Sequence, residues 1–321
     1  MPTIDRRQMV AGMALAAGAA ALPPSALAAS REEISWLPAW KLREMMVARH
    51  ISAVEVTEHF LARIAALEPK LHAFREIQAD GARRQAQAAD QALARGAAPG
   101  PLHGIPIAIK EEIAVKGFVY AEKEGRVSVY DDLMVEKLRQ AGAIVVGTTV
   151  MPGMGHWPDQ KAAYGTEAPT ADQHPRNPWR LDRVPGSSSA GSAAAAAAAM
   201  VPIAIGGDGG GSTRLPGALC GVVGVHTAFG RIPTVDYDNG HFQLTNTHGP
   251  LCRDIRDAAT VMQAVSGPDG RDFISIQDKI DFLADLDHGV SGMKFAWTDD
   301  YGFGAMELWR QAGVVEAIRA A

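Results

Sequence analysis

The sequence predicts an α/β fold in which helices connect the strands of a parallel or mixed sheet. Two apolar runs of buried-strand type, residues 105–109 and 144–147, lie on either side of a helical pattern over 131–141, and the first run ends in Lys110. Parallel neighbours in a sheet need a crossover of this kind. The composition allows a large core, because 47% of the 321 residues are apolar and 21% are charged.

Composition also excludes several classes of protein. The formal net charge is −5, and no long cluster of lysine and arginine is present, so no nucleic acid partner is expected. Disordered, collagen-like and coiled-coil chains are excluded by the balance of apolar and charged residues. We interpret Cys220 and Cys252 as core residues, because neither stands in a CxxC or zinc-ligand spacing. None of the ten histidines falls in an HxH or HExxH pattern, so we expect no metal and no other cofactor.

The first 28 residues have the pattern of a signal peptide. Arg6 and Arg7 precede an apolar run over 9–22, which is shorter than the roughly 20 residues that cross a membrane. Residues 26–28 read Ala-Leu-Ala, a small-x-small cleavage site. Paired arginines before a weakly apolar run favour twin-arginine export, so we expect a periplasmic or secreted protein with no membrane attachment after cleavage. The alternative is an ordinary N-terminal helix.

The next elements are two helices. Ser52 and Glu55 form a capping box, and apolar residues at helical spacing continue to about Leu67. A second stretch over 79–95, rich in alanine, glutamine and arginine, predicts an exposed helix that ends at Gly96.

The second half of the chain contains two clusters of small residues. A polar, proline-punctuated stretch over 172–185 predicts a surface loop. It leads into a serine-rich segment over 186–192 and an alanine tract over 193–199. A short apolar segment over 201–205 then precedes a glycine-rich segment over 206–214.

Three further elements follow. The spacing of apolar residues predicts a helix over 255–265, and residues 293–297 have the composition of a strand. The last residues, 314–321, are in helical register without a terminating glycine or proline.

The serine and glycine clusters allow several interpretations. Gly206 and Gly211 have the separation of a phosphate-binding P-loop, but Ser212 stands where that loop needs lysine. Residues 186–190 come within one residue of the G-x-S-x-G nucleophile elbow, although no strand precedes the serine. A flexible glycine and serine linker would be interrupted by the apolar segment 201–205. The downstream histidines that an elbow could use as its base are His226, His241 and His248.

One further interpretation uses all of these parts together. Segments 104–110, 185–192, 207–214 and 220–224 combine a lysine after an apolar strand, a serine-rich loop and a glycine-rich turn. In order and spacing they resemble the amidase signature family of serine hydrolases. The resemblance implies a large mixed, mostly parallel sheet sandwiched by helices. It also implies a single amidase domain over 29–321 whose C-terminal part is missing, because members of the family usually continue further. Other matching segments are 177–179, 230–233 and 249–251.

The resemblance places the catalytic groups. It implies that Ser212 is the nucleophile, that Ser188 is a second serine on a cis peptide bond, and that Lys110 is the base. Lysine amines have an unperturbed pKa of about 10.4, so a lysine that accepts a proton near neutrality must be buried and neutral. Its place after the apolar run would supply that burial. The amine would take a proton from Ser188, which takes one from Ser212 as Oγ attacks the carbonyl carbon.

The glycine-rich turn is expected to stabilise the oxyanion. Backbone amides of Gly209, Gly210 and Gly211 can converge on one point because no side chains obstruct them. Losing one such donor typically costs about 100- to 1000-fold in rate. The alternative is a simple tight turn. Residues that resemble supporting positions of the family are Ser189, Ser192, Asp208 and Arg214.

Several positions depart from the family's usual residues without removing a member of the triad. The departures fall in the serine-rich loop, beside the aspartate of the glycine-rich turn, directly after the lysine, and just after segment 220–224. They are Ser187 and Ala190 for glycine, Gly207 and Gly209 for threonine or other side chains, Glu111-Glu112 for Asp-Asn, and His226-Thr227 for Lys-Pro.

The sequence therefore favours an amidase that splits a small, linear or cyclic carboxylic amide into acid and amine or ammonia through an acyl-Ser212 intermediate. Met154 and Trp157, in the loop 151–165, are expected to border the substrate, with an ordinary connector as the alternative. A glutamyl-tRNA amidotransferase A-like subunit is another candidate function. A non-catalytic binding descendant of the fold, or an inactive fragment, is the candidate from another class. Whether the protein forms a homodimer stays open.

Overall fold

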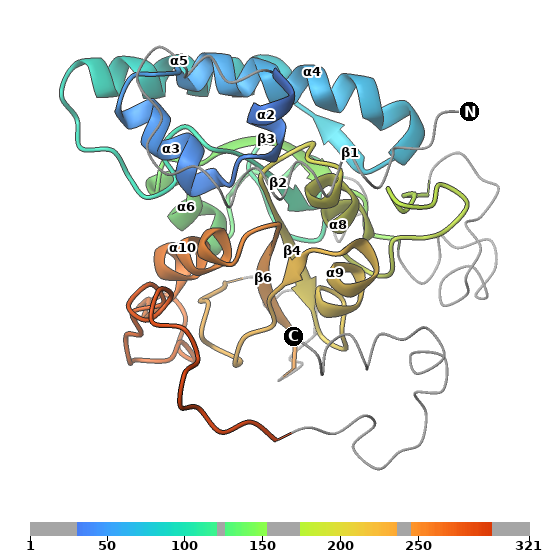
Figure 1. Cartoon of the computed structure of the whole chain (residues 1–321), viewed down its shortest axis with the longest axis vertical. Coiled ribbons are helices and arrows are strands. Elements are labelled where there is room, and N and C mark those ends of the chain that lie inside the picture. The colour runs from blue at the N-terminus through green and yellow to red at the C-terminus, as the bar shows by residue number, and fades with distance from the viewer. Residues whose placement is uncertain (1–30, 121–125, 153–173, 236–244, 297–321) are drawn as a thin grey trace. The chain divides into compact units, whose positions relative to one another are not determined.

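The computed structural model of the protein describes residues 31–120, 126–152, 174–235 and 245–296 (Figure 1). The chain divides into two compact units, Met1–Leu283 and Ala284–Ala321. All described helices and strands belong to the first unit. The described part of the second unit, residues 284–296, contains no helix or strand. The predicted signal peptide over 1–28 and the helical register over 314–321 lie outside the described residues.

A mixed sheet of six strands organises the described part of the first unit, with the order β1-β3-β2-β4-β6-β5. The α/β class that the sequence predicts is confirmed. The three central strands are parallel, because β2 pairs in parallel with both β3 and β4. The outer pairings, β1 with β3, β4 with β6 and β6 with β5, are antiparallel. The strands are β1 (Phe74–Ile77), β2 (Pro106–Lys110), β3 (Ile144–Thr149), β4 (Ile203–Asp208), β5 (Val223–Gly224) and β6 (Thr247–Cys252).

Strands β2 and β3 are the two apolar runs that the sequence predicts as neighbours. They are joined by a crossover that contains α6 (Leu133–Gln140), and Pro106 pairs with Ile144. Every residue of both strands is buried, as expected of central parallel strands covered on two faces. Because β4 also runs parallel to β2, with Ile109 opposite Ile205, the carboxyl ends of β2 and β4 lie side by side. The residues that follow β4 are therefore brought close to Lys110.

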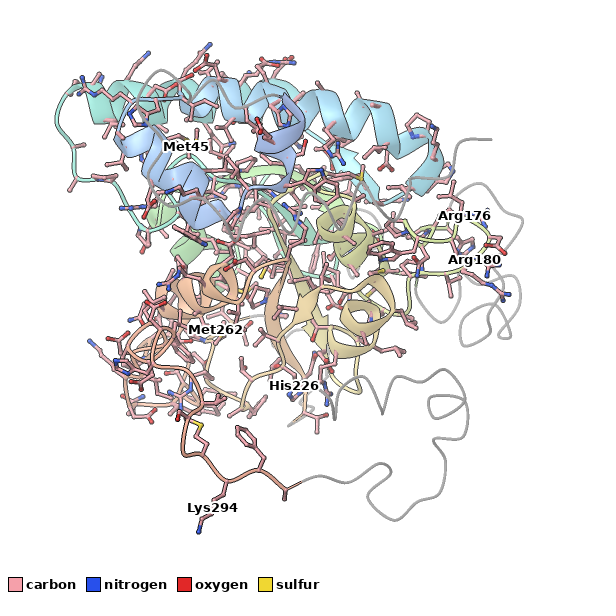
Figure 2. The ribbon with its side chains drawn as sticks, in the orientation of Figure 1. Met45, Arg176, Arg180, His226, Met262 and Lys294 are labelled. Atoms are coloured by element: carbon pink, nitrogen blue, oxygen red, sulfur yellow. The ribbon has the colours of Figure 1, made fainter. Side chains whose placement is uncertain are left out.

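Helices cover the sheet. In Figure 1, α8 (Ala190–Ala197) and α9 (Arg214–Cys220) lie on one side of strands β4 and β6, and α6 and α10 (Ile255–Val265) lie on the other. Helix α10 also contacts α3 (Ala39–Val47), and Met45 of α3 and Met262 of α10 are both buried (Figure 2). No described helix is both long and apolar enough to cross a membrane. The remaining helices are α2 (Arg31–Trp36), α4 (Ala53–Leu71) and α5 (Ala79–Ala94).

Helix α4 begins with the predicted capping box. Ser52 Oγ accepts a hydrogen bond from the Glu55 amide at 3.1 Å, and the Glu55 carboxylate accepts one from the Ser52 amide at 2.8 Å. The helix continues one turn beyond the predicted end because the apolar spacing continues to Leu71, which is buried. Glu68 then accepts hydrogen bonds from the amides of Ala73 and Phe74, which leads the chain into β1.

Most of the other predicted elements are confirmed within a few residues. Residues 79–94, 133–140 and 255–265 are helical, and residues 174–185 form no regular element. The predicted strand over 293–297 is wrong for its described part, because residues 293–296 pair with no other strand and are exposed. A strand needs a neighbour to satisfy its backbone groups, and composition alone does not supply one.

Two arginines hold the C-terminal end of α8. Arg63 donates to the Ala198 carbonyl at 2.8 and 3.0 Å, and Arg253 donates to the carbonyls of Ala196 and Val201 at 2.5 and 3.1 Å. Cations at this position satisfy carbonyls that the helix leaves open and complement its dipole. All eight residues of α8 are buried, so these contacts fix a helix that has no long side chains of its own.

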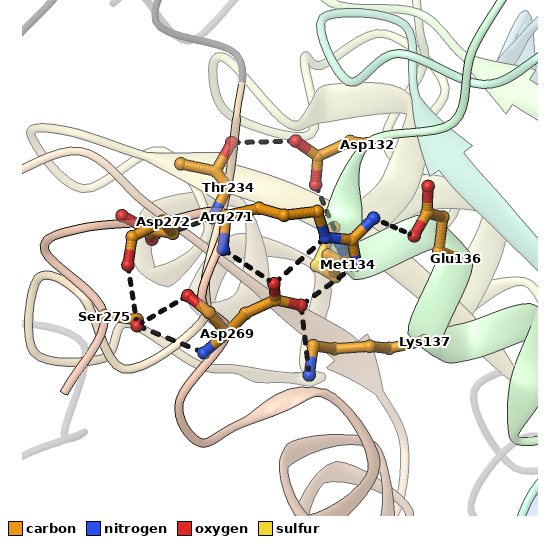
Figure 3. Close-up of polar contacts among 9 residues, drawn as sticks. All are labelled: Asp132, Met134, Glu136, Lys137, Thr234, Asp269, Arg271, Asp272 and Ser275. Carbon is orange, nitrogen blue, oxygen red and sulfur yellow. Dashed lines mark hydrogen bonds and ion pairs between the residues drawn. The ribbon is translucent and has the colours of Figure 1, made fainter. Parts of the chain in front are cut away.

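Polar contacts attach the segment after α10 to the start of α6 (Figure 3). Asp132 caps α6 by accepting from the Met134 amide at 2.9 Å, and it also accepts from Thr234 Oγ1 at 2.7 Å. Arg271 donates to Glu136 at 2.7 Å. The cluster therefore joins three stretches that are distant in sequence. Its other members are Lys137, Asp269, Asp272 and Ser275.

Candidate active site

Lys110 is the last residue of β2, and its side chain is 1% exposed. Its Nζ atom lies 2.7 Å from Ser188 Oγ and 3.3 Å from the Gly207 carbonyl oxygen. Oε1 of Glu112 lies 2.7 Å from the same nitrogen. The predicted burial of the lysine and its contact with the second serine are therefore both present.

Ser188 lies in the loop directly before α8. The peptide bond between Ser187 and Ser188 is cis, as the resemblance implies. Ser188 is half-buried, and its Oγ contacts the buried amine of Lys110. Of the elbow's candidate bases, His226 is half-buried and bonds to the Thr245 carbonyl at 3.0 Å, and His241 lies outside the described residues. The contact with Lys110 favours a lysine-based mechanism over a histidine-based one.

Ser212 lies in the turn that connects β4 to α9 and is also half-buried. The Ser189 amide donates a hydrogen bond to the Ser212 carbonyl at 3.1 Å. This contact brings the serine-rich loop and the glycine-rich turn together. The three separate segments that contain Lys110, Ser188 and Ser212 therefore come together at the carboxyl ends of β2 and β4.

Asp208 organises the glycine-rich turn from beneath. Its buried carboxylate accepts hydrogen bonds from the Gly211 amide at 2.6 Å and from the Thr213 amide at 3.0 Å. Arg214 adds a bidentate contact at 2.9 and 3.0 Å. Burial alone would raise the pKa of Asp208, but these donors outweigh it and hold the pKa well below the usual range. The same contact raises the pKa of Arg214. The structural role expected of Asp208 and Arg214 agrees with these contacts.

One part of the predicted oxyanion hole needs correction. The amide of Gly211 donates to Asp208, and this bond leaves it no proton to direct at a substrate oxygen in this conformation. The glycine is required there for its backbone, because its φ of +116° is one that side chains disfavour. The amides of Gly209 and Gly210, in the same turn, stay the predicted donors.

The supporting serines fix the loop to the sheet. Ser189 Oγ donates to the Gly207 carbonyl at 3.1 Å, and Ser192 Oγ donates to the Ile205 carbonyl at 2.9 Å. Ser192 also shares a hydrogen bond of 2.7 Å with Thr149 Oγ1 on β3. Both hydroxyls are buried, so they hold the start of α8 against β3 and β4.

The position of Glu112 beside the lysine is not predictable from the sequence. Both Glu112 and Gly207 depart from the family's usual residues, but no local pattern connects the two. In the structure the two residues touch, beside the lysine amine. The predicted substrate-contacting residues Met154 and Trp157 lie outside the described residues. Within the described ranges, no group of three or more histidine, cysteine, aspartate or glutamate side chains comes together to hold a metal ion.

The geometry supplies the parts of a proton relay. A buried amine contacts one serine, whose loop is bonded to the turn that carries a second serine. Helix α8 also begins directly after Ser189 of the serine-rich loop, so the positive end of its dipole lies at that loop. Such an arrangement can activate a hydroxyl for attack on a carbonyl carbon.

Comparisons with known proteins identify the family of the chain. The sequence model of the Amidase family matches residues 55–309. The glutamyl-tRNA(Gln) amidotransferase A-type subunit of Carboxydothermus hydrogenoformans is 35% identical over 296 residues, which cover 89% of this chain and 59% of that protein. The protein of the same name from Roseiflexus castenholzii is 39% identical over 284 residues, or 86% and 56% of the two chains. The chain thus spans less than two thirds of the length of these relatives.

Two solved structures superpose on most of this chain. A bacterial aryl acylamidase of the amidase signature family superposes with a TM-score of 0.78 and 31% identity, covering 88% of this chain and 58% of that one. The peptide amidase of Stenotrophomonas maltophilia superposes with a TM-score of 0.72 and 29% identity, covering 88% and 60%.

Proposed function

Because the chain belongs to the amidase signature family, we propose that it hydrolyses the C–N bond of a carboxylic amide. The observation that carries this proposal is the 2.7 Å contact between the buried Lys110 amine and Ser188 Oγ. The bond between the Ser189 amide and the Ser212 carbonyl supports the placement of the nucleophile beside this pair.

In the proposed reaction Ser212 Oγ forms a bond to the carbonyl carbon of the amide. Its proton passes to Ser188, whose own proton passes to the neutral amine of Lys110. As the tetrahedral intermediate collapses, the C–N bond breaks and the relay returns a proton to the leaving nitrogen. Water then attacks the acyl-Ser212 ester by the same path, which releases the acid and restores the serine.

Two features support stabilisation of the negative charge that develops in this reaction. The turn amides of Gly209 and Gly210 precede the nucleophile closely, in a turn that Asp208 and Arg214 hold in place. The N-terminal end of α8, where backbone amides carry partial positive charge, begins next to Ser188.

A second candidate function is that of an amidotransferase subunit, because curated relatives at 35 to 39% identity carry that name. Such a protein would release ammonia from an amide by the same acyl-serine chemistry and would need partner proteins. Measuring ammonia from glutamine, and amine from aryl and peptide amides, with the purified chain alone would separate the two. Turnover of simple amides without a partner would favour the hydrolase.

The direct test of the proposal is covalent labelling. The purified chain and its Ser212→Ala variant are treated with a fluorophosphonate probe, and the adduct is located by peptide mass spectrometry. We expect an adduct on Ser212 that the variant lacks. A chain that takes no adduct would favour a non-catalytic descendant of the fold or an inactive fragment, and repeating the experiment on a C-terminally extended chain would separate these.

We also propose export, on the pattern of residues 1–28. Fusion of these residues to a reporter should direct it to the bacterial periplasm, and replacing both Arg6 and Arg7 by lysine should retain it in the cytoplasm. Retention of the unaltered fusion in the cytoplasm would contradict export.

A further inference from the structure

Glu112 contacts the amine of Lys110, although the proposed reaction uses Ser188 as its partner. Its Oε1 atom lies 2.7 Å from Lys110 Nζ, and its side chain is 19% exposed. Glu111, the carboxylate before it, instead accepts a hydrogen bond from the Met151 amide at 2.7 Å. Of these two adjacent carboxylates, Glu112 is therefore the one placed against the proposed base.

Gly207 on β4 provides the room for this carboxylate. A Cβ atom built on Gly207 would overlap Oε1 of Glu112 and lie 3.1 Å from its Cδ. The backbone of Gly207 is not in the left-handed region, so an alanine is acceptable to the main chain and the glycine is needed for space alone. The carbonyl of Gly207 also accepts from Lys110 Nζ at 3.3 Å. Glu112 and Gly207 thus lie together against the amine of Lys110.

Three oxygen atoms lie around Lys110 Nζ, and their positions fit a base that accepts a proton from Ser188. A neutral amine has two N–H donors and one lone pair. The Gly207 carbonyl can only accept, so it takes one N–H group of the amine. The Glu112 carboxylate forms an ion-pair contact with Nζ but no hydrogen bond, so it occupies a second side of the amine and leaves the lone pair to the Ser188 hydroxyl. When the proton has been transferred, the ammonium has three donors for three acceptors, and a carboxylate lies next to the new positive charge.

Other titratable groups near this cluster are directed elsewhere or are not acidic. His248 on β6 is paired in register with Gly207, and its Cδ2 lies 3.4 Å from the same Cβ position. Asp208 is bound to Arg214, and Glu111 is bound to the Met151 amide. Among the described ion pairs, that with Glu112 is the one that Lys110 makes.

We infer that Glu112 is a positioning residue for Lys110. Gly207, which has no side chain, leaves the space that the Glu112 carboxylate occupies. This inference rests on the proposed function, in which Lys110 acts as the base. Glu112 directs the lone pair of Lys110 toward Ser188 and stabilises the ammonium that proton transfer creates. A carboxylate beside an amine favours the charged form, whereas the reaction needs the neutral one.

The test compares Glu112→Gln with Glu111→Gln, which removes the same charge one residue away. The second-order rate of fluorophosphonate labelling at Ser212 is measured against pH for both variants and the unaltered chain. With Glu112→Gln we expect the acid limb to move to lower pH, and the plateau rate to fall by roughly tenfold or more. Glu111→Gln should leave the limb in place. A limb that stays unmoved in Glu112→Gln, or moves equally in both variants, would overturn the inference.

A second measurement does not depend on activity. Gly207→Ala, Glu112→Ala and the double variant are unfolded in urea. We expect Gly207→Ala to raise the unfolding equilibrium constant by roughly tenfold when Glu112 is present, and to have little effect in the Glu112→Ala chain. Additive effects would overturn the inference. If the unaltered chain takes no label at any pH, the proposed function fails, and this cycle still decides whether Glu112 occupies the space at Gly207.

Discussion

The amide of Ser189 donates a hydrogen bond to the carbonyl of Ser212 at 3.1 Å. This bond joins the loop that contains Ser188 to the turn that contains the proposed nucleophile. The side chain of Ser189 is bound at the same time to the Gly207 carbonyl on β4. The spacing between the two proposed catalytic serines is therefore set by backbone contacts at the end of the sheet.

Replacing Ser188 by alanine should interrupt the proton path while leaving the fold intact. The change removes the hydroxyl that lies 2.7 Å from Lys110 Nζ. We expect the rate of fluorophosphonate labelling at Ser212 to fall by roughly 10²- to 10⁴-fold, with little change in the thermal unfolding midpoint. Ser189→Ala is the matched control, because its hydroxyl bonds to a carbonyl and not to the lysine. Equal losses in the two variants would contradict the assignment of Ser188.

Replacing Asp208 by asparagine should destabilise the glycine-rich turn. The variant loses charge-assisted bonds from Arg214 and from the amides of Gly211 and Thr213. We expect a loss of about 2–4 kcal/mol in the free energy of unfolding at pH 7, measured by urea denaturation.

The size of this loss should depend on pH. The pKa of Asp208 is lower in the folded protein than in the unfolded chain, so the unfolded chain binds more protons below about pH 4. The stabilising effect of the carboxylate is complete above that pH and is lost as the pH falls. The difference between the unaltered chain and Asp208→Asn should therefore narrow below about pH 4. A difference that stays constant down to low pH would contradict this explanation.

Replacing Arg253 by methionine should weaken the support of α8. The guanidinium donates to the carbonyls of Ala196, Val201 and Ser35, which the variant would leave without this donor. We expect the free energy of unfolding to fall by about 3 kcal/mol. Arg256→Met, in α10, is the control. It should lower the free energy of unfolding by about 1 kcal/mol or less. A smaller loss for Arg253→Met than for the control would contradict the role of the arginine at the end of α8.

Replacing Asp132 by alanine should remove both the cap of α6 and the bond to Thr234. The expected loss is about 1–2 kcal/mol in the free energy of unfolding. Thr234→Val removes only the second bond and keeps the shape of the side chain, so it should cost less. Urea midpoints of the two variants check this order, and a larger effect of Thr234→Val would show that the cap contributes little.

Much of the fold follows from local patterns in the sequence. The capping box at Ser52 and Glu55 places the start of α4, because a cap and the helix it begins involve residues only three apart. The apolar runs that become β2 and β3 are recognisable because central parallel strands are buried on both faces. Where a local pattern lacked a tertiary partner, as over 293–297, the predicted strand does not form in the described residues.

Motifs in the sequence identify the residues that are candidates for the chemistry, because Lys110, Ser188 and Ser212 stand in motifs whose order and spacing resemble a known family. Which neighbours touch these residues depends on the tertiary structure. The contact between Lys110 and Glu112, the space at Gly207 and the use of the Gly211 amide by Asp208 all depend on the pairing of β2 with β4 and on the turn that follows. Strand order and register bring together groups that are far apart in the chain. A periodic pattern relates only residues a few positions apart, so it does not predict these contacts.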